Sequence, residues 1–342
     1  MRYFTLGRTG LRVSRTGFGA LPIQRVTFEE AGALLNRALD GGINYIDTAR
    51  AYSDSEEKIG RSIASRRSEY WIATKTGARD AKTFREHLET SLRLLKTDVI
   101  DVYQFHNPGF VPKPGGEDGL YEAALRAREQ GKIRFIGLTN HSLERAFEAV
   151  NSGLYDTLQY PFNHLATEEE IRLVELCREK QVGFICMKAL SGGLITNARL
   201  PFAWLDQFDG LVPIWGFQRM EELEQVLGFS EDPPVLDDAL RAEIERDRKE
   251  LAGAFCRGCG YCLPCPAGIP INNANRITQL LLRSPWKNWV TPEWQANMER
   301  IEDCIHCGAC ASRCPYGLKP YETLPEHLIF YREFVKTHCT EA

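Results

Sequence analysis

Short apolar and β-branched runs alternate with longer amphipathic segments along the first two thirds of the chain. Apolar residues recur every three or four positions at 27–40, 83–95, 118–130 and 168–180, which predicts helices there. The short runs predict eight strands, in the stretches VSRTGFG, INYID, YWIATK, VIDVYQFH, KIRFIGLTN, TLQY, VGFICMK and LVPIW.

Three of the predicted helices carry a start signal in their sequence. In a capping box, a Thr side chain and a Glu three residues later satisfy each other's backbone N–H groups at the first helical turn. The pattern occurs at Thr27 with Glu30, at Thr83 with Glu86, and at Thr167 with Glu170.

The alternation of strands and helices predicts the fold. Strands separated by helices pair in parallel through right-handed crossovers. Eight such units within residues 1–230 predict a (β/α)₈ TIM barrel, with an open doubly wound sheet as the alternative. Residues 231–250 are polar and charged and predict a linker with a helix, which leaves 251–342 for a second, smaller domain.

Composition limits the class of protein, its partners and the cellular compartment that we expect. Apolar residues make up 43% of the 342 and charged residues 26%, as expected for a folded chain with a sizeable core. A net charge of −4 gives no basis for nucleic-acid or membrane partners. No apolar run reaches the length of a membrane span, and the polar N-terminus does not resemble a signal peptide. We therefore expect a cytoplasmic protein.

Polar residues stand at or near the ends of six predicted strands. In a TIM barrel the carboxyl ends of the strands meet at one mouth, where active sites form. A single histidine or lysine there would be unremarkable, but six such positions predict a site: Asp47, Lys75, His106, Asn140, Gln159 and Lys188.

Four residues near that mouth fit the needs of carbonyl reduction. Adding hydride to a carbonyl carbon requires a proton donor for the oxygen, and a tyrosine has a pKa of about 10 unless its surroundings lower it. A lysine cation beside Tyr52 would favour the phenolate, and a carboxylate would hold that lysine charged. We therefore predict Tyr52 as acid, Lys75 as its modulator, Asp47 as the anchor of Lys75, and His106 as the residue that orients the carbonyl.

The stretch GINYIDTARAY, which ends at Tyr52, followed by Lys75 and His106, resembles the catalytic tetrad of the aldo-keto reductases. The resemblance covers roughly residues 3–228. It implies NAD(P)H as hydride donor, with Thr139, Asn140 and Gln159 at the positions that hold the nicotinamide carboxamide.

Other cofactor positions depart from the family pattern. Met187 stands where many members place an aromatic residue that stacks on the nicotinamide. Arg219 could meet the 2′-phosphate of NADPH, but Phe217 is large for its position and Val226 replaces an expected asparagine. The choice between NADPH and NADH stays open.

Eight of the eleven cysteines lie in two short runs after residue 255. The second run has the bacterial ferredoxin spacing C-x₂-C-x₂-C-x₃-C-P, and the first is shorter by one residue. Such runs predict two 4Fe–4S clusters, with zinc as the alternative. The predicted ligands are Cys256, Cys259, Cys262, Cys265, Cys304, Cys307, Cys310 and Cys314.

In two-cluster ferredoxins the cysteine before proline binds the other run's cluster. We therefore predict one cluster on Cys256, Cys259, Cys262 and Cys314, and one on Cys304, Cys307, Cys310 and Cys265. Helical patterns between the runs resemble α-helical ferredoxins, and the combination resembles a ferredoxin-containing branch of the aldo-keto reductases.

Three functions are compatible with the sequence. The first is NAD(P)H-dependent reduction of an aldehyde or ketone, or oxidation of the alcohol. The second is transfer of electrons through the clusters between a ferredoxin-like partner and a substrate or flavin at the barrel mouth. The third is a redox sensor without turnover. Leu21, Pro22, Phe110 and Trp204 are candidates to line a small-molecule pocket.

Overall fold

The computed structural model describes residues 1–251 and 255–339, which divide into two compact units. The first comprises Met1–Ala189 and Arg199–Asp237, and the second Leu190–Ala198 and Asp238–Ala342. The expected linker at 231–250 is thus not separate, because its helix belongs to the second unit. Residues 252–254 and 340–342, within the expected second domain, lie outside the described residues.

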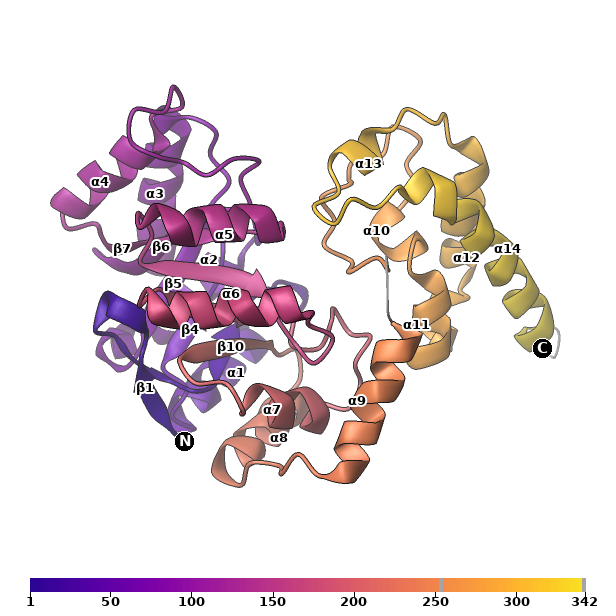
Figure 1. Ribbon diagram of the computed structural model, residues 1–342, viewed down its shortest axis with the longest axis horizontal. Coiled ribbons are helices and arrows are strands. Elements are labelled where there is room, and N and C mark those ends of the chain that lie inside the picture. Colours follow the sequence, from indigo (N-terminus) through magenta and orange to yellow (C-terminus); the bar gives the residue numbers. More distant parts are fainter. Residues whose placement is uncertain (252–254, 340–342) are drawn as a thin grey trace. The chain divides into compact units, whose positions relative to one another are not determined.

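The first unit is a closed barrel of eight parallel strands, as the sequence predicts, with helices around it (Figure 1). Neighbours pair in chain order, and β10 pairs with β3 to close the barrel. The strands are β3 (Gly17–Gly19), β4 (Tyr45–Asp47), β5 (Trp71–Thr76), β6 (Ile100–His106), β7 (Ile133–Thr139), β8 (Thr157–Pro161), β9 (Gly183–Met187) and β10 (Leu211–Gly216).

A short antiparallel hairpin precedes the barrel, formed by β1 (Tyr3–Thr5) and β2 (Arg12–Ser14). The predicted strand VSRTGFG is therefore divided, because its first residues pair with β1 and only Gly17–Gly19 enter the barrel. Three side chains of this segment are buried in one apolar cluster with residues of five barrel strands: Leu6, Leu11 and Val13 pack with Tyr45, Ala73, Val102, Ile185 and Val212. Apolar burial of this kind stabilises the barrel from inside.

The α-helices of the first unit are α1 (Phe28–Asp40), α2 (Ser55–Ile63), α3 (Ala81–Leu95), α4 (Leu120–Glu129), α5 (Leu143–Ser152), α6 (Glu168–Glu179), α7 (Arg199–Leu205) and α8 (Met220–Glu231). Four of them, α1, α3, α4 and α6, lie at the predicted ranges, and the other four were not predicted individually.

Two of the three predicted capping boxes are confirmed, at Thr27 and at Thr167. The prediction at Thr83 is wrong. Helix α3 begins earlier, because the Asp80 carboxylate accepts hydrogen bonds from the backbone N–H groups of Lys82 and Thr83, both at 2.9 Å. An aspartate at the N-cap of a helix satisfies the free N–H groups of the first turn as well as a threonine does.

The described part of the second unit is helical. Its helices are α9 (Asp238–Glu250), α10 (Ile271–Ala274), α11 (Ile277–Arg283), α12 (Pro292–Glu299), α13 (Ala309–Ser312) and α14 (Pro320–His338), drawn in orange to yellow in Figure 1. Neither unit has, among the described residues, a helix long and apolar enough to cross a membrane.

Candidate functional site

The polar residues of the site follow from the two-residue period of the barrel strands. Side chains two positions apart share a face of a strand. Tyr45, Ala73 and Val102 point into the apolar cluster of the barrel. Two residues further along the same strands come Asp47, Lys75 and Gln104, which therefore also face the interior, one layer closer to the mouth.

A buried ion pair lies at the centre of this layer. The Lys75 ammonium group donates to Asp47 Oδ1 at 2.6 Å and to the Thr48 carbonyl at 2.7 Å. Both side chains are almost inaccessible to water, with 1% and 2% exposure. Burial raises the pKa of Asp47 and lowers that of Lys75, while the attraction between the two opposes both shifts. A charge buried this deeply requires its partner, so each side chain holds the other in place.

Tyr52 and His106 lie beside this pair. The Lys75 Nζ atom is 5.3 Å from the centre of the Tyr52 ring, and the His106 ring meets the Tyr52 ring edge-on, with centroids 5.8 Å apart. Burial, and next the nearby Lys75 cation, lower the pKa of His106 to about 3. The imidazole is therefore neutral at physiological pH. The four predicted catalytic residues are gathered in one place.

The residues expected to hold a nicotinamide lie on the next strands. Thr139 ends β7, where it pairs with His106 of β6 and with Gln159 of β8. Asn140 follows at once and is fixed through its side chain, which donates to the Pro108 carbonyl at 3.0 Å and accepts from the Ser142 N–H at 2.8 Å. Gln159 donates to Asp47 Oδ1 at 3.4 Å, which links this row to the ion pair.

Met187 and Arg219, the other two predicted cofactor contacts, differ in their exposure to solvent. Met187 ends β9 and is partly buried. Arg219 precedes α8 with a side chain that is 72% exposed and paired with Glu222 at 2.7 Å. Phe217 is buried against Phe18, with ring centroids 5.2 Å apart. Phe217 therefore packs inside the barrel unit, and Arg219 is held by a carboxylate of its own helix.

In the second unit, the cysteines of the first run approach Cys314 of the second. Burial first, and then the charges of Cys256, Cys259 and Cys314, raise the pKa of Cys262 to about 12. Burial and the neighbouring Cys259 and Cys314 likewise raise the pKa of Cys256. Four mutually repelling thiolates can all ionise only beside a strongly positive centre, so this set suits an iron–sulfur core.

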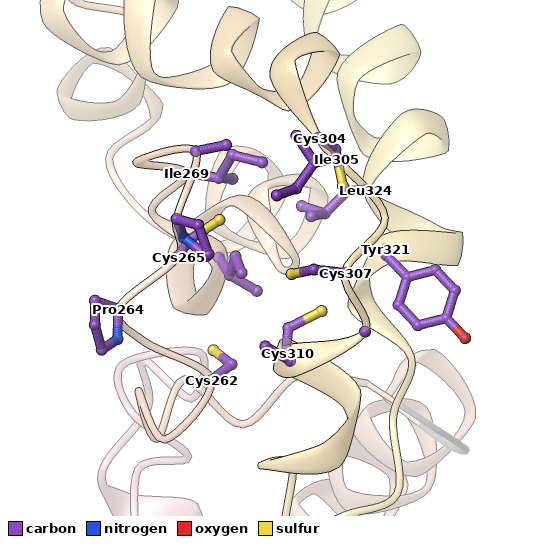
Figure 2. Close-up of a pocket in the computed structure, with 15 residues that line it drawn as sticks. Cys262, Pro264, Cys265, Ile269, Cys304, Ile305, Cys307, Cys310, Tyr321 and Leu324 are labelled. Atoms are coloured by element: carbon purple, nitrogen blue, oxygen red, sulfur yellow. The ribbon is translucent and has the colours of Figure 1, made fainter.

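The remaining cysteine of the first run lies with the second run. Cys265 and Cys262 line one hollow together with three cysteines of the second run: Cys304, Cys307 and Cys310. Figure 2 shows the side chains of Cys265 and Cys307 extending into the space between the two loops. Because Cys262, predicted for the other cluster, lines the same hollow, the crossed pairing stays a prediction. No three His, Cys, Asp or Glu side chains of the described residues converge closely enough to hold a single metal ion.

Comparison with known proteins agrees with the geometry of the barrel unit. The model of the aldo/keto reductase family matches residues 15–203, more than half of the chain. This chain belongs to the aldo/keto reductase family. The predicted resemblance is therefore confirmed, and so is its second part, because residues 255–319 of this aldo/keto reductase match the model of the 4Fe-4S dicluster domain.

Individual relatives cover the barrel unit. The chain is 33% identical to the aldo-keto reductase YhdN of Bacillus subtilis over 58% of its own length, and spans 64% of that protein. It is 29% identical to the aldo-keto reductase yakc [NADP(+)] of Schizosaccharomyces pombe over 71% of its length and 91% of that protein. A solved aldo-keto reductase from Pseudomonas aeruginosa is 27% identical, with a TM-score of 0.61 over 67% of this chain and 94% of its own.

Sequence reasoning missed one polar residue of the site and misplaced one candidate for the pocket lining. Gln104 is fully buried and donates to Asp47 Oδ2 at 3.3 Å. The alternation of Val102, Gln104 and His106 in β6 was the signal that could have found it. Trp204, expected at the pocket, is buried among aromatic rings instead, 5.0 Å from the Phe162 ring and 4.7 Å from that of Phe208.

The low pKa of His106 predicts that this residue adds no ionisation to the pH profile of kcat/KM of this aldo/keto reductase. Because the folded-state pKa, about 3, lies below the ordinary value of about 6.5, the imidazole gains no proton between pH 5.5 and 8. We expect the acid limb of a kcat/KM profile to have the same shape in wild type and His106→Gln. An acid limb near pH 6.5 that His106→Gln abolishes would contradict the assignment, because kcat/KM reports ionisations of the free enzyme.

Proposed function

We propose that the barrel unit reduces an aldehyde or ketone with NAD(P)H, or oxidises the corresponding alcohol, with Tyr52 as acid and base. The observation that carries the proposal is the buried Asp47–Lys75 pair beside the Tyr52 ring, with neutral His106 also in contact with that ring. This arrangement provides a proton donor next to a fixed positive charge, which is what a developing alkoxide requires.

The proposed reaction assigns one task to each residue. The nicotinamide, when bound, supplies the hydride that adds to the carbonyl carbon. The Tyr52 hydroxyl gives its proton to the carbonyl oxygen, and the Lys75 cation stabilises the phenolate that remains. His106 orients the carbonyl as a neutral hydrogen-bond donor, and water returns a proton to Tyr52. In alcohol oxidation the same proton moves back to Tyr52.

Transfer of a labelled hydride tests this proposal. With NADPH or NADH deuterated at the reactive face of carbon 4, the full-length protein should place deuterium on the carbinol carbon of the product, across a panel of aldehydes and ketones. Product without deuterium, formed by the same protein with dithionite alone, would contradict hydride transfer.

We propose Thr139, Asn140 and Gln159 as contacts of the nicotinamide, with Met187 beside it and Arg219 toward the adenosine phosphate. Support comes from the fixed geometry of Asn140, whose amide is held at both ends, and from the relative named for NADP(+). The exposed Arg219 can turn from Glu222 to a phosphate, because the pair gains little at the surface.

Replacing Arg219 tests the preference for NADPH. A hydrogen bond to a charged group is worth about 1.5–3 kcal/mol, so Arg219→Ala should weaken NADPH binding about 10–100-fold. NADH lacks the 2′-phosphate and should bind almost as before. Equal losses for both, measured by quenching of protein fluorescence, would remove Arg219 from the phosphate site.

For the second unit we propose two 4Fe–4S clusters with the crossed ligand sets: Cys256, Cys259, Cys262 and Cys314 for one, and Cys304, Cys307, Cys310 and Cys265 for the other. The coupling of Cys256 and Cys262 to Cys314, and the hollow that Cys265 shares with the second run, support this pairing. Reduced thiolates of this kind fit a cytoplasmic protein.

One observation favours a second function. In the segment after β10, which the family resemblance assigns to the adenosine end of NADPH, Phe217 is buried against Phe18 and Arg219 is paired with Glu222. If this segment excludes the nucleotide, electrons would instead reach the substrate, or a flavin, from a ferredoxin-like partner through the clusters. The clusters would then be reoxidised by substrate without consumption of nicotinamide.

A further inference from the structure

Arg276, at the start of α11, is a buried cation whose placement the fold alone does not explain. The residue is 8% exposed. Its Nη1 atom donates to the Gly192 carbonyl at 3.1 Å, and its Nη2 to Asn273 Oδ1 at 3.5 Å. Its Nε has no hydrogen-bond partner among the described residues. A positive charge at the N-terminal end of a helix also opposes the helix dipole, so the helix gains nothing from it.

Two glycines make room for this guanidinium. A Cβ atom at Gly258 would lie 2.6 Å from the Arg276 Cζ atom, and one at Gly192 would lie 3.0 Å from Nη1. Gly258 stands between Cys256 and Cys259, so the guanidinium packs directly against the first cysteine loop. Both glycines also have positive φ angles, of +62° and +68°, which other residues rarely adopt.

The charged groups that act on Arg276 are cysteine side chains of the first run. Burial lowers its pKa, and the thiolates of Cys256 and Cys259 act in the opposite direction. A buried charge is stable only when it is paired, and cluster-bound Cys256 and Cys259 thiolates would supply the opposite charge. A 4Fe–4S core bound by four thiolates is an anion, and reduction adds one more negative charge. The reduction potential of such a cluster depends on nearby charge and on hydrogen bonds to its sulfurs.

We propose that Arg276 is a positioning residue that raises the reduction potential of the cluster bound by Cys256, Cys259, Cys262 and Cys314, with its unpaired Nε–H as a donor to a cluster sulfur. This inference rests on the proposed clusters. It makes the two clusters unequal, because the cluster beside Arg276 accepts the electron more readily. When one electron enters the pair of clusters, it then resides preferentially on this cluster.

Redox titration of the full-length protein, followed by EPR, tests this inference. Arg276→Gln removes the charge and keeps side-chain amide donors for the Gly192 carbonyl. In this variant the equilibrium constant for reduction of the cluster beside residue 276 should fall about tenfold or more. A tenfold change corresponds to a shift of ~59 mV in the potential of a one-electron couple. The other cluster should not shift. Arg276→Lys keeps both the charge and N–H donors, and should stay within about threefold of wild type.

Arg283→Gln is the matched control. Arg283 ends the same helix, about 10 Å from Arg276 by helical rise, and pairs with carboxylates of α9, Asp247 and Glu250. The Arg283→Gln substitution should leave both reduction potentials unchanged.

Unchanged potentials in Arg276→Gln, or a tenfold shift in Arg276→Lys, would overturn the inference. Wild-type protein without iron would instead overturn the proposed clusters, so the two failures are distinguishable. If Arg276→Gln loses its cluster, Arg276→Lys still tests the inference, because a tenfold shift in that variant would overturn it.

Discussion

Tyr52→Phe should lower kcat/KM for carbonyl reduction by about 10²–10⁴-fold, the usual contribution of general acid catalysis. The substitution removes a hydroxyl and keeps the ring, so the edge-on contact with His106 at 5.8 Å can persist. Binding of the nicotinamide should change little, because no predicted cofactor contact involves Tyr52. Steady-state kinetics and a separate measurement of cofactor binding check both parts.

Tyr3→Phe is the matched control for this loss. Tyr3 lies in β1, and its hydroxyl donates to the Gly42 carbonyl at 2.9 Å, outside the catalytic group. It should retain nearly full activity. A Tyr52→Phe enzyme with half the wild-type rate would exclude Tyr52 as the acid. A loss equal in both variants would point to general damage.

Cys314→Ser should damage the cluster of the first cysteine run, and Cys265→Ser that of the second. The reason is the crossed arrangement, in which Cys314 acts on Cys256 and Cys262 while Cys265 shares a hollow with Cys304, Cys307 and Cys310. Wild type should contain about eight iron and eight sulfide per chain. Each variant should lose up to half of both, with a changed EPR signal from one cluster.

Matched single variants reveal which cluster is damaged. The spectrum of Cys314→Ser should resemble that of Cys256→Ser, and the spectrum of Cys265→Ser that of Cys304→Ser. Cys339→Ser, at the end of α14 and outside both runs, is the control and should keep all iron. If Cys314→Ser instead matches Cys304→Ser, each run closes its own cluster. Stoichiometric zinc in anaerobically purified protein would exclude the iron–sulfur clusters altogether.

The barrel could be predicted from sequence because its signals are local. Eight short β-branched runs separated by amphipathic helices leave few topologies, and strand-end positions of Asp47, Lys75 and His106 follow from parallel pairing. The hairpin before the barrel was missed because β1 was not recognised as a strand and β2 was assigned to the first barrel strand. Such short strands give no clear alternation, and the pairing of Tyr3 with Ser14 is a tertiary contact.

The second unit was less predictable, because its organisation depends on contacts that are distant in sequence. Cysteine spacing indicates clusters through a short-range rule. Nothing in the spacing indicates that Leu190–Ala198, which follows β9, joins this unit, or that Gly192 meets Arg276. In the first unit, the alternation in β6 could have indicated that Gln104 faces the interior, but its contact with Asp47 joins residues distant in sequence.

The central claim, hydride transfer at Tyr52 from a bound nicotinamide, is tested most directly by an anaerobic titration of the full-length protein. Absorbance of the reduced nicotinamide and of the clusters is followed together while a carbonyl substrate is added. We predict that one nicotinamide is oxidised per carbonyl reduced, with the cluster absorbance unchanged. Clusters that are bleached by dithionite and recover on addition of substrate, while NADPH and NADH stay unoxidised, would contradict it.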